Sequence, residues 1–336
     1  MKKLIAALVA VIIIAAIGAG VYFFVIDDTV LTYQDTKISK AEAEVYARTQ
    51  EYTLENEYGS YLGESMWETN ISDGVTLEDS TKEEAIETLR TVKVLIAHAE
   101  ELNVSLDDEE KAAAKESAES FEESDAGKKI IEITGAETEL IEQIFEENAL
   151  ANKVKEAIYD SADTEVSDED ASVKTVYKLV FATTKTDANG EEVELSDEQK
   201  AKQLKKAKKA YKQAKKGADF SFLAKQYDIK DLMEETYGVG RSINGEEWEA
   251  AVDKLEKGEI TKVMETTQGY VVTKLISEND EDAVKELKAT IKEERQQEAY
   301  DSKLEEWTKD ESFDYSKDMK SRLWDDVTFT YGELTE

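Results

Sequence analysis

Residues 262–276 read KVMETTQGYVVTKLI, and this stretch decides the fold that the sequence predicts. Its pattern is that of a strand, a tight turn and a second strand, because Gly269 and Tyr270 are followed by alternating apolar residues. Val271, directly after the Gly-Tyr pair, either carries chemistry or extends the apolar alternation of its strand. The residues around the hairpin indicate what kind of sheet contains it and whether Val271 lies in a functional site.

The block that contains this hairpin, residues 173–279, mixes strand and helix signals. Residues 173–184, VKTVYKLVFATT, are rich in β-branched and aromatic side chains, and Asn189-Gly190 is a hairpin-type turn signal. A helix is expected from Ser196, which begins an S-x-x-Q capping box. The block therefore predicts a small antiparallel sheet with helices.

The helix after Ser196 carries eight lysines between Lys202 and Lys216. This density is compatible with an anion-binding site. A solvated helix face beside an acidic neighbouring domain is the more common reason for such a run, and we rank it first.

The preceding block, residues 28–172, shows mainly helical periodicity. A short strand and turn at residues 30–38 comes before a capping box that starts at Ser39, and a second box is expected to start a helix at Ser80. Apolar residues after Ser80 recur at three- and four-residue spacing, which gives one buried stripe. Apart from the short strand, this block predicts an all-helical domain.

Three more helices are expected, at about 107–123, at about 137–159 and at about 282–309. Charge separates the blocks as well, since residues 27–170 carry a net charge of −28 and residues 171–280 one of −1. A shift of this size in composition indicates separate folded units.

The segment from Tyr46 to Trp67 is rich in aromatic residues and contains Gly59 and Gly63. It is interpreted first as an irregular, packed excursion between two helices. The alternative is an aromatic-lined groove for unfolded polypeptide.

The N-terminal segment is apolar enough to cross a membrane. Residues 4–26 contain no charge, and as a helix they would extend about 35 Å, against a hydrocarbon core of about 30 Å. Lys2 and Lys3 precede the run, which places everything after Asp28 outside the cytoplasm. The alternative is a cleaved signal peptide with its site near residues 18–20, but the run continues beyond that site, so an uncleaved single-pass anchor is favoured.

Composition excludes several classes of function. The net charge is −35, so the chain as a whole would repel nucleic acid. There is no Cys, which excludes disulfides and thiolate sites, and the single histidine, His98, lies in a helical pattern where a packed role is expected. No metal-ligand spacing is present, so neither a metal nor another cofactor is predicted.

The mixed block resembles a parvulin domain, the fold of one class of peptidyl-prolyl isomerase. Five short segments match the family's in the same order. They are Gly217–Phe220 running into Leu223–Tyr227, then Gly238, Trp248–Val252 with Leu255, Lys257–Ile260, and Thr266–Tyr270. The flanks resemble PrsA- and SurA-type foldases, in which a late helix packs back onto the helical N-terminal region.

The resemblance implies an α+β fold with four parts. An all-helical chaperone domain of the SurA type is completed by a C-terminal helix and has a parvulin-like domain inserted. The predicted parts are an anchor or signal segment at 1–27, the helical domain at 28–172, the parvulin-like domain at 173–279 and the C-terminal helix at 280–336.

The resemblance also places the family's catalytic positions. Its two histidines fall on Lys178 and Val271, its Asp or Cys on Thr236, its aromatic residue on Trp248 and its hydroxyl on Thr266. Only the aromatic and the hydroxyl positions keep the family's chemistry, so the expected site is degenerate. By the same resemblance the residues expected to touch substrate are Tyr237, Trp248, Met264 and Tyr270.

These observations predict an extracytoplasmic, membrane-tethered foldase whose partners are unfolded or newly exported polypeptides. The alternative is a working peptidyl-prolyl isomerase, since a shaped, desolvated pocket alone can lower the barrier to rotation about an X-Pro bond. The interpretation as a wall-associated helical structural protein is ranked last, because it does not account for the five segments that match in order. The sequence does not indicate an oligomeric state.

Overall fold

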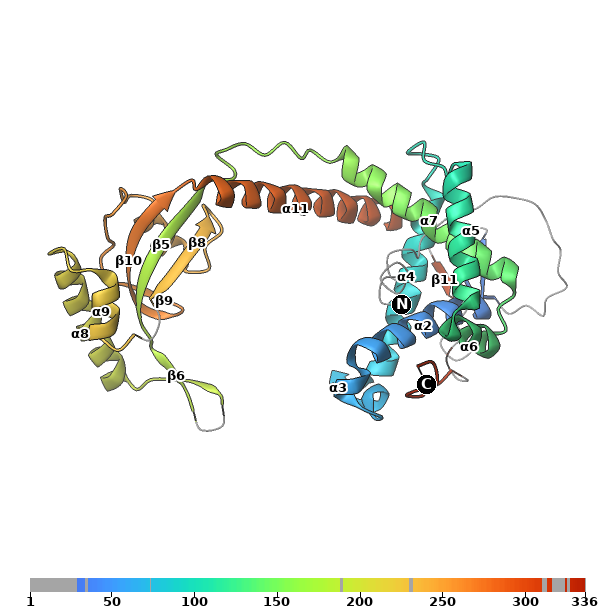
Figure 1. The fold of residues 1–336 in the computed structure, drawn as a ribbon, viewed down its shortest axis with the longest axis horizontal. Coiled ribbons are helices and arrows are strands. Elements are labelled where there is room, and N and C mark those ends of the chain that lie inside the picture. Colours follow the sequence, from blue (N-terminus) through green and yellow to red (C-terminus); the bar gives the residue numbers. More distant parts are fainter. Residues whose placement is uncertain are drawn as a thin grey trace. The chain divides into compact units, whose positions relative to one another are not determined.

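The computed structural model describes residues 29–33, 36–72, 74–187, 190–229, 232–309, 313–315, 324 and 327–335. The chain divides into two compact units, unit 1 at Met1–Ala162 with Gln296–Glu336, and unit 2 at Asp163–Arg295 (Figure 1). The predicted membrane segment, 4–26, lies outside the described residues. Within those residues, no helix is long and apolar enough to cross a membrane.

Unit 1 is built mainly from helices. They are α2 (Lys40–Leu54), α3 (Ser60–Leu62), α4 (Leu77–Ala97), α5 (Asp108–Glu123), α6 (Asp125–Thr134) and α7 (Thr138–Ser161), with a π-helical turn η1 (Glu55–Gly59) and a 3-10 turn η2 (Met66–Glu68). Helix α2 begins where the sequence predicts, because the Ser39 hydroxyl accepts a hydrogen bond from the Glu42 amide at 3.2 Å. Helix α4 begins four residues earlier than predicted, since Thr76 and Asp79, rather than Ser80, form the capping box.

Unit 1 also contains strands, so the prediction of an all-helical domain is wrong. β1 (Thr29–Tyr33) pairs with β2 (Thr36–Ser39) and with β11 (Phe313–Tyr315), and β3 (Asn70–Ser72) pairs with β4 (Val75–Thr76), all antiparallel. The β1–β11 pairing joins residues about 280 positions apart. Local periodicity carries no information on a contact of that sequence separation, which is why the sequence shows only the short first strand.

The core of unit 1 encloses a charged cluster as well as apolar side chains. The Lys93 ammonium, with 1% of its side chain exposed, forms ion pairs with the carboxylates of Glu42, at 2.7 Å, and Glu147. Burial raises the pKa of Glu42, although Lys93 opposes this effect. Asn148 lies in the same core and donates a hydrogen bond to the Tyr46 hydroxyl at 2.9 Å.

Helix α11 (Glu281–Thr308) contributes residues to both units. Its later part packs in unit 1, where the Trp307 ring stacks on His98 with the centroids 4.3 Å apart. His98 is half-buried and its Nδ1 bonds to a Glu101 carboxylate oxygen at 3.0 Å. Its surroundings match the packed role that the sequence predicts.

Unit 2 is a four-stranded antiparallel sheet with helices, and its strand order is β8-β5-β10-β9 (Figure 1). The elements are β5 (Val173–Phe181), β6 (Thr184–Thr186), β7 (Glu192–Glu194), α8 (Asp197–Ala214), α9 (Phe220–Gln226), β8 (Met233–Gly238), α10 (Glu246–Val252), β9 (Met264–Thr266) and β10 (Gly269–Glu278). The hairpin of β9 and β10 is the stretch quoted first above, and its second strand lies at the centre of the sheet beside β5.

The two faces of this sheet have different partners, because side chains alternate along each strand. One face carries Leu179, Phe181 and Val272, which pack on α8 and α9. The opposite face carries Val176 and Leu275, which pack with Tyr237, Trp248 and Val252 of β8 and α10. We call the second face the α10 face, and it holds most of the predicted site residues.

Candidate functional site

Lys178 lies at the centre of the α10 face, where the family resemblance places a histidine. Its side chain is fully buried in strand β5. The ammonium forms an ion pair with the Glu235 carboxylate and donates hydrogen bonds to the side-chain oxygens of Asn244 and Gln268, both at 3.0 Å. An ammonium has three protons, so these three acceptors saturate it.

Asn244 completes the network around the ion pair. Its amide nitrogen donates to the Glu235 carboxylate at 2.9 Å and to the Ser242 hydroxyl at 3.0 Å. One amide thus bonds to both members of the pair, and its own side chain is satisfied at the same time. A buried charge is tolerable only when it is paired and hydrogen-bonded in this way.

Trp248 forms the floor of the α10 face. Its side chain is 1% exposed, and its indole N–H donates to the Thr273 hydroxyl on β10 at 2.9 Å. The Lys178 ammonium lies 5.8 Å from the centroid of the indole ring, within cation–π range. Tyr237 packs against the same indole with the centroids 5.2 Å apart.

The Tyr237 hydroxyl is buried and has no hydrogen-bond partner among the described residues. Burial raises the pKa of Tyr237, and the nearby carboxylates of Asp253, Glu249 and Glu235 raise it further. The phenol therefore stays neutral at any physiological pH, and as a hydrogen-bond donor it has no role in the closed network around Lys178.

Thr266, the retained hydroxyl position, is engaged in the β9–β10 turn. Its hydroxyl donates to the Gly269 carbonyl and accepts from the Gln268 amide, both at 3.2 Å. Gly269 has φ +118°, and an added Cβ would lie 2.5 Å from the Phe181 carbonyl oxygen, so this position requires glycine. The turn places the Gln268 side-chain oxygen where it accepts a hydrogen bond from the Lys178 ammonium.

Val271 lies on the α10 face and is fully buried, but it does not lie directly beside Lys178. Its partners across the sheet are Val180 on β5 and Met264 on β9, whereas Lys178 lies opposite Thr273. Met264 belongs to the apolar cluster of Trp248. Val271 thus extends the apolar alternation of its strand and offers no polar group to a site.

Two predicted residues lie on the other face of the sheet. The Thr236 hydroxyl bonds to that of Thr175 at 2.9 Å, and the two residues are partners in the β5–β8 register. Tyr270 packs in the cluster formed with α8 and α9. The structure therefore does not bring Thr236 or Tyr270 to Lys178.

The polar residues that do meet Lys178 are Glu235, Asn244 and Gln268, and sequence reasoning did not select them. Glu235 is one position from Thr236, so the alternation of strand β8 decides which of the two faces the site. The signal that could have found Glu235 is the aromatic residue Tyr237, two positions later. Side chains two positions apart in a strand share a face, and Tyr237 is buried on the α10 face.

Apolar side chains near this site are exposed. Ile243, next to Asn244, is 76% exposed, and Met233, opposite Lys178 in the β5–β8 register, is 39% exposed. Val239, directly after β8, is 37% exposed. A buried polar centre with exposed apolar residues beside it is compatible with a surface that contacts polypeptide.

Residues 180–277 match the family described as "Rotamase: PPIC-type PPIASE domain". The match begins at the last two residues of β5 and runs through β8, α10 and β9 to most of β10. The chain contains a PPIC-type rotamase domain. Lys178 lies just before the matched residues, while Glu235, Trp248 and Val271 lie within them.

Relatives of known name match a longer part of the chain. The "Foldase protein PrsA" of Clostridium botulinum strain Langeland is 28% identical over 253 residues, which cover 68% of this chain and 71% of that protein. The protein of the same name from strain Loch Maree is 29% identical over 245 residues, with the same coverage. The similarity to PrsA foldases thus extends beyond the rotamase domain.

Solved structures of two proteins give weaker likenesses. A peptidylprolyl isomerase (PrsA) from Bacillus cereus is 18% identical, covers 89% of this chain and 99% of its own, and has a TM-score of 0.36. A structure from Campylobacter jejuni, whose title names two SurA-like chaperones, is 12% identical, covers 86% and 99%, and has a TM-score of 0.32. The assignment of the rotamase domain rests on the sequence matches.

Proposed function

We propose that this chain is an extracytoplasmic foldase, tethered by residues 4–26, whose rotamase domain binds polypeptide and rotates X-Pro bonds slowly or not at all. The foldase role is supported by the PrsA relatives and by the PPIC-type domain. The location is supported by the uncharged N-terminal run with Lys2 and Lys3 before it. Its partners are unfolded or newly exported polypeptides.

The observation that carries the proposal of low activity is the saturated ammonium of Lys178. By the resemblance the family has histidines at positions 178 and 271, whereas Lys178 here already uses all three protons on Glu235, Asn244 and Gln268. Val271 is apolar, and the Thr266 hydroxyl is held in its turn. Accelerated rotation requires groups that stabilise the twisted amide more than the planar one, and these residues offer none.

Client binding is supported by exposed apolar side chains in unit 1. They lie between α2 and α4, and some of them belong to the Tyr46–Trp67 segment that the sequence singles out, in which Tyr46, Met66 and Trp67 are buried. Soluble proteins rarely expose such clusters unless they bind something. The exposed residues are Tyr58 (44%), Tyr61 (88%), Leu62 (38%), Ile71 (50%) and Val75 (39%).

The second candidate is an active prolyl isomerase, and the family match over residues 180–277 favours it. Trp248 keeps an aromatic floor, and desolvation by that floor alone lowers the barrier to some extent. A prolyl-peptide isomerisation assay on the full chain separates the two candidates.

The foldase role itself is tested by aggregation of reduced lysozyme, a basic unfolded polypeptide. We expect the full chain, at several-fold molar excess, to suppress light scattering. Unchanged scattering at that excess would contradict the proposal, whatever the isomerase assay shows.

A further inference from the structure

Residues 327–335 form a segment that lies on unit 1 with every second side chain buried at its start. Val327 is 3% exposed and Phe329 is 4% exposed, while Thr328 and Thr330 between them are exposed. Further along, Leu334 is 2% exposed. We call residues 327–335 the docked segment.

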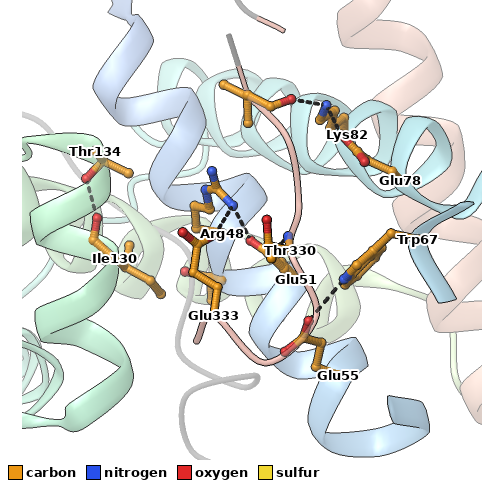
Figure 2. A network of polar contacts seen from close by, with 12 residues as sticks. Arg48, Glu51, Glu55, Trp67, Glu78, Lys82, Ile130, Thr134, Thr330 and Glu333 are labelled. Carbon is orange, nitrogen blue, oxygen red and sulfur yellow. Dashed lines mark hydrogen bonds and ion pairs between the residues drawn. The ribbon is translucent and has the colours of Figure 1, made fainter. Parts of the chain in front are cut away.

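Side chains and backbone groups both hold the docked segment. The Glu333 carboxylate pairs with Arg48 at 3.5 Å (Figure 2), and the Thr335 hydroxyl donates to the Glu55 carboxylate at 3.1 Å. Three backbone groups are bonded as well. The Thr330 amide donates to the Glu51 carboxylate at 3.2 Å, and the Gly332 amide donates to both oxygens of Glu55 at 3.2 Å. The Val327 carbonyl accepts a hydrogen bond from the Lys82 ammonium. Because a carboxylate or an ammonium that binds a peptide group does not read the side chain, these three contacts are available to any extended polypeptide.

Both carboxylates are also held by groups outside the docked segment. Glu51 is fully buried and accepts from the Arg48 guanidinium at 2.7 Å, and Glu55, 5% exposed, accepts from the Trp67 indole N–H at 3.0 Å (Figure 2). Each keeps acceptor capacity for a backbone amide. We call the surface formed by Arg48, Glu51, Glu55, Trp67 and Lys82 the seat. If the seat served only to pack a core, it would be apolar, because buried carboxylates cost free energy unless they are hydrogen-bonded.

An aromatic side chain of the docked segment enters the same seat. The Phe329 ring meets the edge of Trp67 with the centroids 4.9 Å apart, and the charged groups of Arg48 and Lys82 each lie 5.4 Å from its centroid. Two cations and an indole around one ring form an aromatic-binding site.

Charged groups of both signs surround the docked segment. The Arg48 guanidinium pairs with the Glu333 carboxylate at 3.5 Å, and the Lys82 ammonium bonds to the Val327 carbonyl, while Glu51 and Glu55 accept from backbone amides. The site thus offers cations to an acidic side chain and carboxylates to peptide groups.

The docked segment also contacts a turn that carries exposed apolar residues of unit 1. The Tyr331 hydroxyl donates to the Gly59 carbonyl at 3.3 Å, and Gly59 lies between Tyr58 and the exposed Tyr61 and Leu62. The docked segment therefore leaves these neighbouring apolar side chains exposed.

We propose that the docked segment occupies a client-binding site, and that an extended, aromatic-containing segment of a client displaces it from Glu51, Glu55 and Trp67. This inference rests on the proposed foldase function and names the site on unit 1 that serves it. The chain carries its own occupant of the site, which limits binding until a client of higher affinity arrives.

Hydrogen exchange on the unmodified full chain tests the displacement directly. With saturating reduced lysozyme, we expect the amides of Thr330 and Gly332 to exchange at least about tenfold faster than without it. Amides of the α4–α7 core serve as the control and should not change. If the two amides keep their protection while lysozyme aggregation is suppressed, the inference fails and the foldase function stands.

A peptide probe tests the site independently of chaperone activity. The probe is a fluorescein-labelled peptide that copies residues 324–336, and its anisotropy reports binding. We expect the Phe329→Ala/Leu334→Ala chain to bind it at least about tenfold more tightly than the unmodified chain, because the site is then open in a larger fraction of molecules.

Thr328→Ala, which changes an exposed side chain of the same segment, should bind the probe as the unmodified chain does. Equal affinity of all three proteins, or no binding by any of them, would overturn the proposal. If the double variant is unfolded by circular dichroism, the hydrogen-exchange result decides by itself.

Discussion

Lys178 and Thr273 are direct partners across strands β5 and β10, so Val271 is one pair further along the same face. Diagonal neighbours of this kind lie about 7 to 8 Å apart, within reach of long side chains. Two histidines at 178 and 271 would therefore face the same space above Trp248. In this chain that space is filled by a lysine, its acceptors and an apolar side chain.

Removing the Lys178 charge is expected to destabilise the rotamase domain. Lys178→Met leaves Glu235 without its buried partner, and breaking such a pair costs about 3 to 5 kcal/mol. Urea unfolding followed by circular dichroism measures the loss. The double variant Lys178→Met/Glu235→Leu should recover most of it, because no unpaired charge remains. Equal stability of the single variant and the parent would show that the pair is not coupled.

The Lys93 cluster in unit 1 gives a second stability prediction. Lys93→Met leaves the buried carboxylates of Glu42 and Glu147 without a cation, and we expect a loss of about 3 to 5 kcal/mol. Lys115→Met is the matched control, since the Lys115–Glu142 pair is exposed and should change the stability by about 0.5 kcal/mol or less. Similar effects for the two variants in urea unfolding would argue against the cluster.

The turn of the β9–β10 hairpin predicts a steric effect. Gly269→Ala combines φ +118° with a Cβ only 2.5 Å from the Phe181 carbonyl oxygen, so the backbone has to move. Gly190→Ala also has a positive φ, +87°, but its Cβ would meet nothing within 4 Å. We expect Gly190→Ala to cost about 1 kcal/mol and Gly269→Ala clearly more, measured by thermal unfolding. Equal costs would mean that the hairpin has room for a side chain.

Stability should depend on pH through Glu51. Burial raises its pKa from 4.5 to about 7, with Glu55 and Glu333 acting in the same direction and Arg48 opposing them. The folded state therefore holds this proton more tightly than the unfolded state. Its contribution, of the order of 3 kcal/mol, is complete below about pH 4.5 and is lost as the pH rises through about 7.

The check is urea unfolding at about pH 5.5 and about pH 8, for the parent and for Glu51→Gln. The parent should lose stability between the two values, and the variant should lose distinctly less. The raised pKa of Glu42 acts in the same direction in both proteins, so the difference between them isolates Glu51. The same slope in both would assign the pH dependence elsewhere.

The sequence predicts the elements of this fold well where the signal is local. The predicted N-caps at Ser39 and Ser196 lie where the helices begin, and the hairpin of residues 262–276 forms strands β9 and β10. These features depend on residues within a few positions of one another.

Features that depend on distant residues were not predicted. The β1–β11 pairing and the seat of Phe329 on Trp67 join parts of the chain more than 250 residues apart. In the rotamase domain, the choice between Thr236 and Glu235 depends on which face of β8 meets Lys178, and a shift of one residue reverses that face. A register of this kind is fixed by pairing with β5, which a single sequence does not display.

Prolyl-peptide isomerisation by the full chain tests the central claim most directly. We predict a rate at the uncatalysed background for the parent, and a measurable increase for Lys178→His/Val271→His if that variant is folded. Acceleration by the parent that is lost in Trp248→Ala would contradict the account, because the α10 face would then be an active site rather than a binding surface.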